Sequence, residues 1–307
     1  MSKSVIWPRG CATALVTPFK PDGTVDLPRM RALVERQIKG GVGVLVPCGT
    51  TGERATMSDD EGRQVIAATI EAANFRAHVI AGAGSNNTAH AIEQAKEAQR
   101  MGADGVLIVA PYYNKPTQEG LVAHFRAVAE AVDPLPVMMY NVPGRTSSNI
   151  QAATTLKLAR EVPNIVAIKE ASGDFAQIMA ILRERPADFR VLSGDDAVTL
   201  PLMALGADGI VSVASNEAPD LMVQLTKLAL AGQWDEARAL HFKLLPLMEV
   251  NFIESSPGPV KAAMAMMGLL EEQFRLPLVP IKEASRARVR EVLAATGLLD
   301  ARAHAAA

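Results

Sequence analysis

The sequence lacks the features that mark secreted, membrane-spanning or nucleic-acid-binding proteins. None of its apolar runs reaches the roughly 18 residues that a membrane span requires. Its formal net charge is -2 and it has no long basic run, which argues against nucleic acids and anionic membranes as partners. Residues 1–8 lack the apolar core of a signal peptide, so we expect a cytoplasmic protein.

Cysteine and histidine are also scarce. The two cysteines, Cys11 and Cys48, lie in apolar, strand-like runs, which favours buried, unreactive thiols over a disulfide or a nucleophile. The five histidines show no paired spacing of the kind that ligates zinc. The sequence therefore predicts no metal site.

The composition is otherwise that of an ordinary globular protein, with 49% hydrophobic and 21% charged residues. A chain of 307 residues can form two domains, or one α/β barrel with an addition. Eight short apolar runs alternate with stretches of helical period, and their near-continuous Val, Ile and Leu content is typical of strands covered on both faces. The runs are Ala12–Val16, Val42–Pro47, His78–Ala81, Gly105–Ala110, Pro136–Tyr140, Ile165–Lys169, Arg190–Ser193 and Gly209–Val213.

Helix signals occur between these runs. Ser58 begins a Ser-Asp-Asp-Glu capping pattern, Asp174 follows a glycine, and residues 89–100 have opposed apolar and charged faces. Two nearly identical segments, 101–106 and 205–210, each place a glycine at a helix end, before the fourth and eighth runs. Their separation by half the array favours a closed (β/α)8 TIM barrel.

A doubly wound open sheet is the alternative fold, although Gly82-Ala-Gly84 is only a fragment of the glycine fingerprint such a sheet carries. After Val213 the pattern becomes helical, and helices are predicted over 219–231, 233–250, 257–267 and 282–296. We therefore expect an α/β barrel in residues 1–216. A C-terminal helical domain, residues 217–307, is expected to pack three helices against it and to fray over 301–307.

The most informative stretch is Ile165–Glu170, a short apolar strand that carries a lysine near its end. Lys169 can extend its ammonium into water along an apolar stem. It can also pair with Glu170, although neighbouring residues of a strand point to opposite faces. A third interpretation is a desolvated amine that attacks a carbonyl.

Polar residues follow the predicted strands at their carboxyl ends, where a barrel of this type carries its active site. All three tyrosines of the chain lie at these ends, which is more than packing alone would place at one rim. The polar ends are residues 47–53, 111–114, 140–145, Lys169 and 193–196.

These residues suit amine chemistry. An amine that attacks a ketone must exchange protons with a carbinolamine before water leaves, and this requires hydroxyl groups within reach. Tyr140 is the expected shuttle, and Thr50 can connect it to Tyr113. Glycines flank Thr50 and Thr51, so their backbone can cradle a carboxylate, although a simple turn is the alternative. Arg145 offers a fork that matches a second carboxylate, unless it forms a surface ion pair.

Four segments together resemble the pyruvate-dependent class I aldolases, the N-acetylneuraminate lyase-like superfamily, and within it the dihydrodipicolinate synthase family. They are Gly49-Thr-Thr-Gly-Glu53, Tyr112-Tyr-Asn114, Tyr140-Asn-Val-Pro-Gly-Arg-Thr146 and Ile168-Lys-Glu-Ala171. The resemblance extends from Gly10 to Pro280 and includes Pro257-Gly-Pro-Val-Lys261. The Thr-Thr loop and the lysine are common to the superfamily, whereas the arginine and the Tyr-Tyr-Asn run mark the synthase branch.

The resemblance implies a lyase of lysine and diaminopimelate biosynthesis that condenses pyruvate with aspartate semialdehyde and needs no metal or organic cofactor. Lys169 would form a Schiff base with pyruvate, whose carboxylate Thr50 and Thr51 would hold. Arg145 would bind the carboxylate of the semialdehyde.

The remaining site residues are also implied by the resemblance. Tyr140 and Thr50 would relay protons with Tyr113, which in the family enters the site of a neighbouring subunit. This arrangement implies a homodimer, usually paired into a homotetramer. Gly194 and Val211 would border the bound substrate.

Two other functions remain open at this stage. Another pyruvate aldolase or dehydratase, such as a sialic acid lyase or a keto-deoxy-sugar-acid enzyme, would keep Lys169, Tyr140 and the Thr-Thr loop but has no need of Arg145. A non-catalytic sensor of keto acids on the same barrel is the alternative from another class.

Many members of the family are inhibited by lysine in a cleft between two subunits, and here that cleft is altered. Asn86 and Tyr112 match the family's asparagine and tyrosine. The family's small residue, two histidines and glutamate correspond to Arg54, Asp59, Gly62 and His90. A lysine ligand carries two ammonium groups that need acceptors, so we expect an enzyme that is insensitive or only weakly sensitive to lysine.

Overall fold

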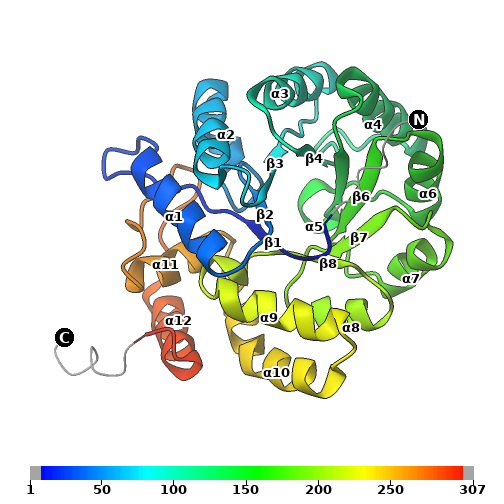
Figure 1. Ribbon diagram of the computed structural model, residues 1–307. Helices are drawn as coiled ribbons and strands as arrows, with labels where there is room; N and C mark the ends of the chain where they lie inside the picture. The colour runs from blue at the N-terminus through cyan, green and yellow to red at the C-terminus, as the bar shows by residue number, and fades with distance from the viewer. Residues whose placement is uncertain (1–7, 300–307) are drawn as a thin grey trace.

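The computed structural model describes residues 8–299, and within this range eight parallel strands close into a barrel (Figure 1). The ring runs in chain order, with β1 paired to both β2 and β8. The strands are β1 (Gly10–Ala14), β2 (Val44–Val46), β3 (His78–Gly82), β4 (Gly105–Val109), β5 (Val137–Asn141), β6 (Ile165–Glu170), β7 (Arg190–Ser193) and β8 (Gly209–Ser212). The predicted TIM barrel is confirmed, and the open-sheet alternative is wrong.

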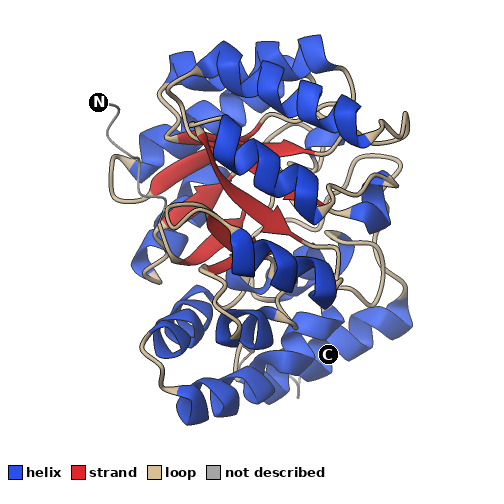
Figure 2. Cartoon of the chain, turned by 90° about the vertical axis from the view of Figure 1, so that its right-hand side faces the viewer, coloured by secondary structure: helices blue, strands red, loops and turns tan. Residues whose placement is uncertain are grey.

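Helices surround the strands on the outside, as Figure 2 shows. They are α1 (Leu27–Lys39), α2 (Asp59–Ala73), α3 (Thr88–Met101), α4 (Gln118–Val132), α5 (Pro143–Thr146), α6 (Ala152–Glu161), α7 (Phe175–Glu184), α8 (Thr199–Ala204), α9 (Pro219–Leu230), α10 (Trp234–Val250), α11 (Gly258–Met266) and α12 (Glu283–Thr296). Short 3-10 turns occupy Arg54–Thr56 and Ala214–Asn216. The predicted caps are confirmed: Ser58 and Glu61 form a reciprocal capping box on α2, and the Asp174 side chain caps α7.

The barrel wall separates two apolar cores because successive side chains of a strand point to opposite faces. On β5, Met138 and Tyr140 lie in the inner core, whereas Val137 and Met139 pack outward against the helices. Both cysteines are buried and free, as predicted. Burial raises the pKa of the Cys48 thiol to about 12, although the nearby charge of Arg54 opposes this rise.

The C-terminal helices form a layer on one side of the ring, coloured yellow to red in Figure 1. Helix α9 contacts β1 and β8, while α10 packs on α9 and α12, and α11 packs on α12. Because α9 covers two barrel strands, it joins the barrel to this layer. The division of the chain after residue 216 stays a prediction, and the expectations for residues 1–7 and 301–307 lie outside the described range. None of the helices within it is long and apolar enough to cross a membrane.

A buried ion pair joins the C-terminal layer to the loop that follows β2. Lys261 of α11 and Glu53 are both fully buried, with Nζ 2.6 Å from Oε1. The same ammonium donates to the carbonyl oxygen of Gln273 and lies 4.5 Å from the ring centroid of Phe19. Burial raises the pKa of the Glu53 carboxyl and lowers the pKa of the Lys261 ammonium, while the attraction between the charges opposes both shifts.

Removing one partner of this pair is expected to destabilise the protein strongly. Lys261→Met leaves the Glu53 carboxylate buried and unpaired, which costs about 3–5 kcal/mol in the free energy of unfolding. In the folded variant the pKa of Glu53 is raised, so at low pH the folded protein contains the neutral carboxyl, which is tolerated in the interior. As pH rises this carboxyl loses its proton, and the folded variant becomes less stable. The deficit against the wild type should therefore shrink as pH falls, and urea unfolding at fixed protein concentration measures it.

Arg238→Ala is the matched control, because it breaks an exposed ion pair with Asp235. It should change the free energy of unfolding by about 0–1 kcal/mol. Equal losses in the two variants would show that the buried pair has no special role.

Candidate active site

The centre of the candidate site is the contact between Lys169 and Tyr140 at the carboxyl ends of β6 and β5. The two residues are opposite one another in the strand register. Each is only 5% exposed, and the Lys169 Nζ lies 4.2 Å from the centroid of the Tyr140 ring. The lysine thus neither extends freely into water nor pairs with Glu170, which lies on the opposite face of the strand. The geometry leaves a desolvated amine beside a phenol.

Gly194, directly after β7, makes room for this lysine. A Cβ at position 194 would lie 3.0 Å from Cε of Lys169 and 2.7 Å from Cβ of Ala171, which is closer than such atoms approach. Val211 on β8 is fully buried in the inner core with Tyr140. The structure therefore places Gly194 against the lysine and Val211 in the same barrel interior.

A cavity of about 550 Å³ opens at this end of the barrel, and Thr50, Tyr140 and Arg145 all line it. Thr51 is buried, whereas Thr50 is exposed. Within residues 8–299, no group of three or more His, Cys, Asp or Glu side chains is placed to hold a metal ion. The cavity offers hydroxyls, an amine nearby and a guanidinium, which are the groups required to activate a keto acid and bind a second anion.

The Thr50–Thr51 loop has a backbone shape that its neighbours determine. Cys48 and Glu53, at its two ends, have φ values of 59° and 55°, in the left-handed region. Gly82 of β3 is required here, because a Cβ at that position would lie 2.1 Å from the carbonyl oxygen of Cys48. The Thr17 hydroxyl donates to the carbonyl oxygen of Gly52 at 2.6 Å. These contacts hold the loop close to the barrel mouth.

Arg145 belongs to the short helix α5, which follows β5 and begins at Pro143. Its Nη2 donates to the carbonyl oxygen of Ser256, at 3.4 Å, and the side chain is otherwise exposed. The alternative of a surface ion pair does not hold, because no carboxylate of the described residues pairs with it. Its donors are therefore available to an anion in the cavity.

Tyr113 is not brought into the cavity of its own chain. Its side chain is 88% exposed, and its φ of 72° places it in the left-handed region that a tyrosine seldom adopts. Its backbone nitrogen donates to the carbonyl oxygen of Thr146 at 3.4 Å, so the loop after β4 is tied to the Arg145 segment. Tyr112, its neighbour, does line the cavity.

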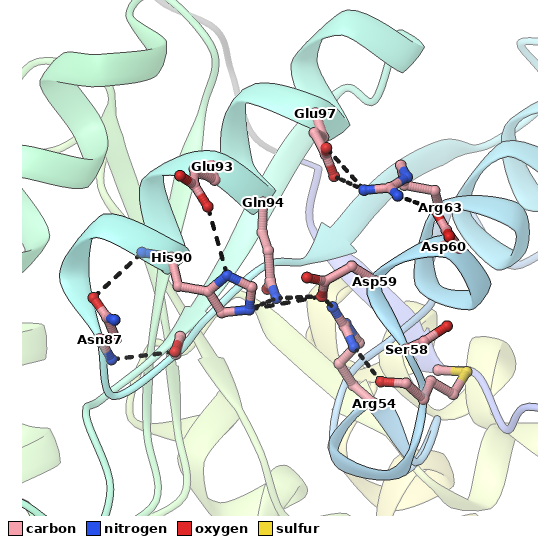
Figure 3. A network of polar contacts seen from close by, with 12 residues as sticks. Arg54, Ser58, Asp59, Asp60, Arg63, Asn87, His90, Glu93, Gln94 and Glu97 are labelled. Atoms are coloured by element: carbon pink, nitrogen blue, oxygen red, sulfur yellow. Dashed lines mark hydrogen bonds and ion pairs between the residues drawn. The ribbon is translucent and has the colours of Figure 1, made fainter.

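The altered cleft is an internal network of charges, drawn in Figure 3. Arg54 pairs with Asp59 and donates to the carbonyl oxygen of Met57 at 2.9 Å. Its guanidinium occupies the space beside Gly62, where a Cβ would lie 3.1 Å from Nε. The Arg54–Asp59 pair holds the pKa of the Asp59 carboxyl below its usual range.

His90 lies at the other side of the same network (Figure 3). Its Nε2 is 3.6 Å from Asp59, and the Nε2 of Gln94 approaches it to 2.7 Å. Arg54, Asp59 and His90 all line the cavity, while Asn86 accepts a hydrogen bond from Asn114 through its backbone oxygen. The structure thus gathers most of the predicted cleft residues at one place.

Two pairs of residues at the site carry no clear signal of their roles in the sequence. Glu53 and Lys261 each lie in a recognised motif, but no local pattern shows that they pair, because they are 208 positions apart. Asn141 and Glu170 follow the two central residues directly, and their mutual contact depends on the β5–β6 register. The adjacency of a polar residue to each of Tyr140 and Lys169 is the only signal in the sequence.

Comparisons with known proteins identify relatives that match nearly the whole chain. The model of the Dihydrodipicolinate synthetase family matches residues 8–296. A curated 4-hydroxy-tetrahydrodipicolinate synthase from Koribacter versatilis is 56% identical, over 95% of this chain and 97% of its own length. A pyruvate complex of dihydrodipicolinate synthase from Acinetobacter baumannii has a TM-score of 0.93 at 45% identity, covering 95% and 99% of the two chains. The enzyme from Cyanidioschyzon merolae, solved with lysine bound, has a TM-score of 0.93 at 42% identity, with the same coverage.

Proposed function

This chain belongs to the dihydrodipicolinate synthetase family, and we propose that it condenses pyruvate with L-aspartate 4-semialdehyde to give 4-hydroxy-tetrahydrodipicolinate. The observation that carries the proposal is the buried Lys169 amine, 4.2 Å from the Tyr140 ring, beside a cavity that Arg145 lines. It is supported by relatives of this name that match nearly the whole chain.

The reaction begins when the unprotonated amine of Lys169 adds to the ketone carbon of pyruvate. The carbinolamine loses water to give an imine, and loss of a methyl proton converts the imine to an enamine. The enamine carbon attacks the aldehyde carbon of the semialdehyde, whose oxygen takes up a proton. The substrate's own amine then adds to the imine carbon, closes the ring and releases Lys169.

Proton transfers fall to hydroxyl groups around the amine. The Tyr140 phenol is adjacent to Lys169 and can accept and return the protons of the carbinolamine step. Thr50 and Thr51 hold the pyruvate carboxylate, and Arg145 holds the carboxylate of the semialdehyde. Gly194 and Val211 border the bound keto acid.

The relay is completed by Tyr113 of a second copy of the chain. The 88% exposure of its side chain and its left-handed backbone support this role, because the phenol is free to reach the site of a neighbouring copy. The assembly is therefore a homodimer, further paired into a homotetramer. The reaction takes place in the cytoplasm, in keeping with two free, buried thiols.

The proposed function is tested by supplying pyruvate and aspartate semialdehyde to the purified protein and following the product with a coupled reductase. Turnover that needs both substrates is the expected result. A pyruvate adduct without turnover of the semialdehyde would instead identify another aldolase or dehydratase of the superfamily. Absence of any adduct would identify a non-catalytic binding protein.

Lys169→Arg tests the nucleophile. The variant should fold but form no pyruvate adduct, because arginine stays protonated and cannot act as an amine nucleophile. Borohydride reduction in the presence of pyruvate, followed by mass spectrometry of peptides, measures the adduct. A trapped adduct on another lysine of the variant would refute the assignment.

Arg145→Ala tests recognition of the second substrate. The kcat/KM for aspartate semialdehyde should fall, because a charge-assisted, bidentate contact is lost. The fall should correspond to about 2–4 kcal/mol of transition-state stabilisation. Trapping of the pyruvate Schiff base should change much less. The exposed Arg183 is the matched control, since Arg183→Ala removes a guanidinium whose one ion pair within residues 8–299 is with Glu184. Equal losses for both substrates would show that Arg145 supports the whole site.

The charge network around Arg54 supports the expectation that a lysine ligand binds weakly or not at all. Asp59, a carboxylate that could replace the family's glutamate, already accepts hydrogen bonds from Arg54 and from Gln94. Arg54 itself adds a positive charge where a cationic ligand would bind. An ammonium group that leaves water without finding an acceptor loses more hydration free energy than it gains from the site.

We therefore expect lysine to inhibit this enzyme weakly or not at all. Losing one charged acceptor and gaining a like charge should cost several kcal/mol, or more than about a hundredfold in affinity. A titration of activity with L-lysine measures this, and half-inhibition below about 1 mM would contradict it. The double variant Arg54→Ser, His90→Glu restores a small residue and a carboxylate, so it should gain sensitivity.

A further inference from the structure

Strands β5 and β6 are paired with a shift in register that places the two central residues opposite each other. Val137 pairs with Ile165, but Met138 pairs with Ala167, so Val166 is an extra residue on β6. Beyond this bulge, Tyr140 faces Lys169 and Asn141 faces Glu170. Without it, Tyr140 would be opposite Ile168, and the alignment of phenol and amine would be lost.

The second of these facing pairs is directly hydrogen-bonded on the outer face of the barrel wall. The Nδ2 of Asn141 donates to both carboxylate oxygens of Glu170, at 3.2 and 3.1 Å. Asn141 is fully buried and Glu170 is 1% exposed. Glu170 also accepts from the backbone nitrogen of Ser172 at 2.7 Å and from Nε2 of Gln177 at 3.3 Å.

The network continues into the segment that carries Arg145. The backbone nitrogen of Ile150 donates to Oδ1 of Asn141 at 2.9 Å, and Nδ2 of Asn141 donates to Oδ1 of Asn149 at 2.8 Å. Asn149 and Gln177 exchange hydrogen bonds of 2.9 and 3.2 Å. Among the described residues, no buried polar atom of this group lacks a partner. A network in which every donor has an acceptor holds one geometry.

Burial raises the pKa of the Glu170 carboxyl, and the hydrogen bonds from Ser172, Asn141 and Gln177 oppose this rise. All four contacts of its oxygens come from donors, so the carboxylate form satisfies the site and a carboxylic acid would not. The network therefore needs one charged acceptor at the end of β6.

We propose that Asn141 and Glu170 are positioning residues for the reaction: their contact outside the barrel holds the β5–β6 register that sets the Lys169 amine beside the Tyr140 phenol inside it. The inference rests on the proposed function, since it concerns the amine and phenol of that mechanism. A displacement of about 1 Å between reacting groups can cost a hundredfold in rate. Asn141 also accepts from the backbone nitrogen of Ile150, which holds the end of the segment that carries Arg145. The positions of both substrates therefore depend on this pair of residues.

Glu170→Gln is the first test. In one orientation the new amide nitrogen faces the donors of Asn141 and Ser172, and in the other it faces those of Asn141 and Gln177. Donor then meets donor, so the hydrogen bonding between β5 and β6 is weakened. The rate of Schiff-base formation at saturating pyruvate should fall by about 10- to 100-fold, measured per folded enzyme well below its melting temperature. Asn141→Ser, which removes the amide donor to Glu170 and the oxygen that accepts from the Ile150 nitrogen, should give a similar fall and replaces the first variant if that one does not fold.

The exchange of the two groups provides a rescue. In Asn141→Asp, Glu170→Gln the carboxylate moves to β5 and the amide to β6, so the number of charges is unchanged and one hydrogen bond between the two side chains is kept in the reversed direction. The amides of Asn149 and Gln177 need only rotate to match the reversed direction. Schiff-base formation should recover to within about threefold of the wild type, because the register is held again.

Asn164→Ala is the matched control for stability. Asn164 lies directly before the other end of β6, is buried, and donates to the carbonyl oxygens of Ala129 and Leu135. Its loss should lower the melting temperature as Glu170→Gln does, yet leave the rate of Schiff-base formation within about twofold of the wild type.

Three results would overturn the inference. The first is a wild-type rate in Glu170→Gln, and the second is a fall in Asn164→Ala as large as in Glu170→Gln. The third is an exchanged double variant as slow as the single variants. A wild-type protein that forms no pyruvate adduct overturns the proposed function itself, which is checked before any variant is compared.

Discussion

The buried ion pair between Glu53 and Lys261 is the contact on which the arrangement of the site depends. It joins the loop that presents Thr50 and Thr51 to a helix that lies outside the ring of strands. Both side chains are withdrawn from water, so each charge is tolerated only while the other is present. The Ser256 carbonyl that contacts Arg145 lies just before the helix that carries Lys261, so the position of this helix bears on both the Thr50–Thr51 loop and Arg145.

The chemistry of the site is divided between the two faces of the barrel wall. Lys169 and Tyr140 point into the interior, where an amine and a phenol are held out of water. Asn141 and Glu170 point outward, where a complete set of hydrogen bonds is formed between strands and helices. A parallel strand exposes its two faces to different surroundings, so adjacent residues can have separate tasks.

One wall of the cavity carries a network of charged and polar side chains that bind one another. Arg54 fills the space beside Gly62 and forms an ion pair with Asp59. His90 and Gln94 also contact Asp59. These contacts are internal to one chain. They already occupy Asp59, an acceptor of the kind that a cationic ligand would need.

The sequence by itself determined the fold class and the identity of the central residues. Eight apolar runs were sufficient to predict every strand, because a strand buried on both faces must be apolar almost throughout. Lys169, Tyr140 and the Thr-Thr loop were recognisable because each directly follows or ends such a run. The capping box at Ser58 is likewise a local pattern with a local physical cause.

Only the tertiary structure decided which distant residues meet. The extra residue Val166 shifts the register of β6 by one position, and no composition or periodicity reveals a shift of that size. The pairing of Glu53 with Lys261, and the contact of Arg145 with the Ser256 carbonyl, join segments far apart in the chain. Such contacts depend on how the whole chain packs, whereas strand and helix patterns depend on neighbours within a few residues.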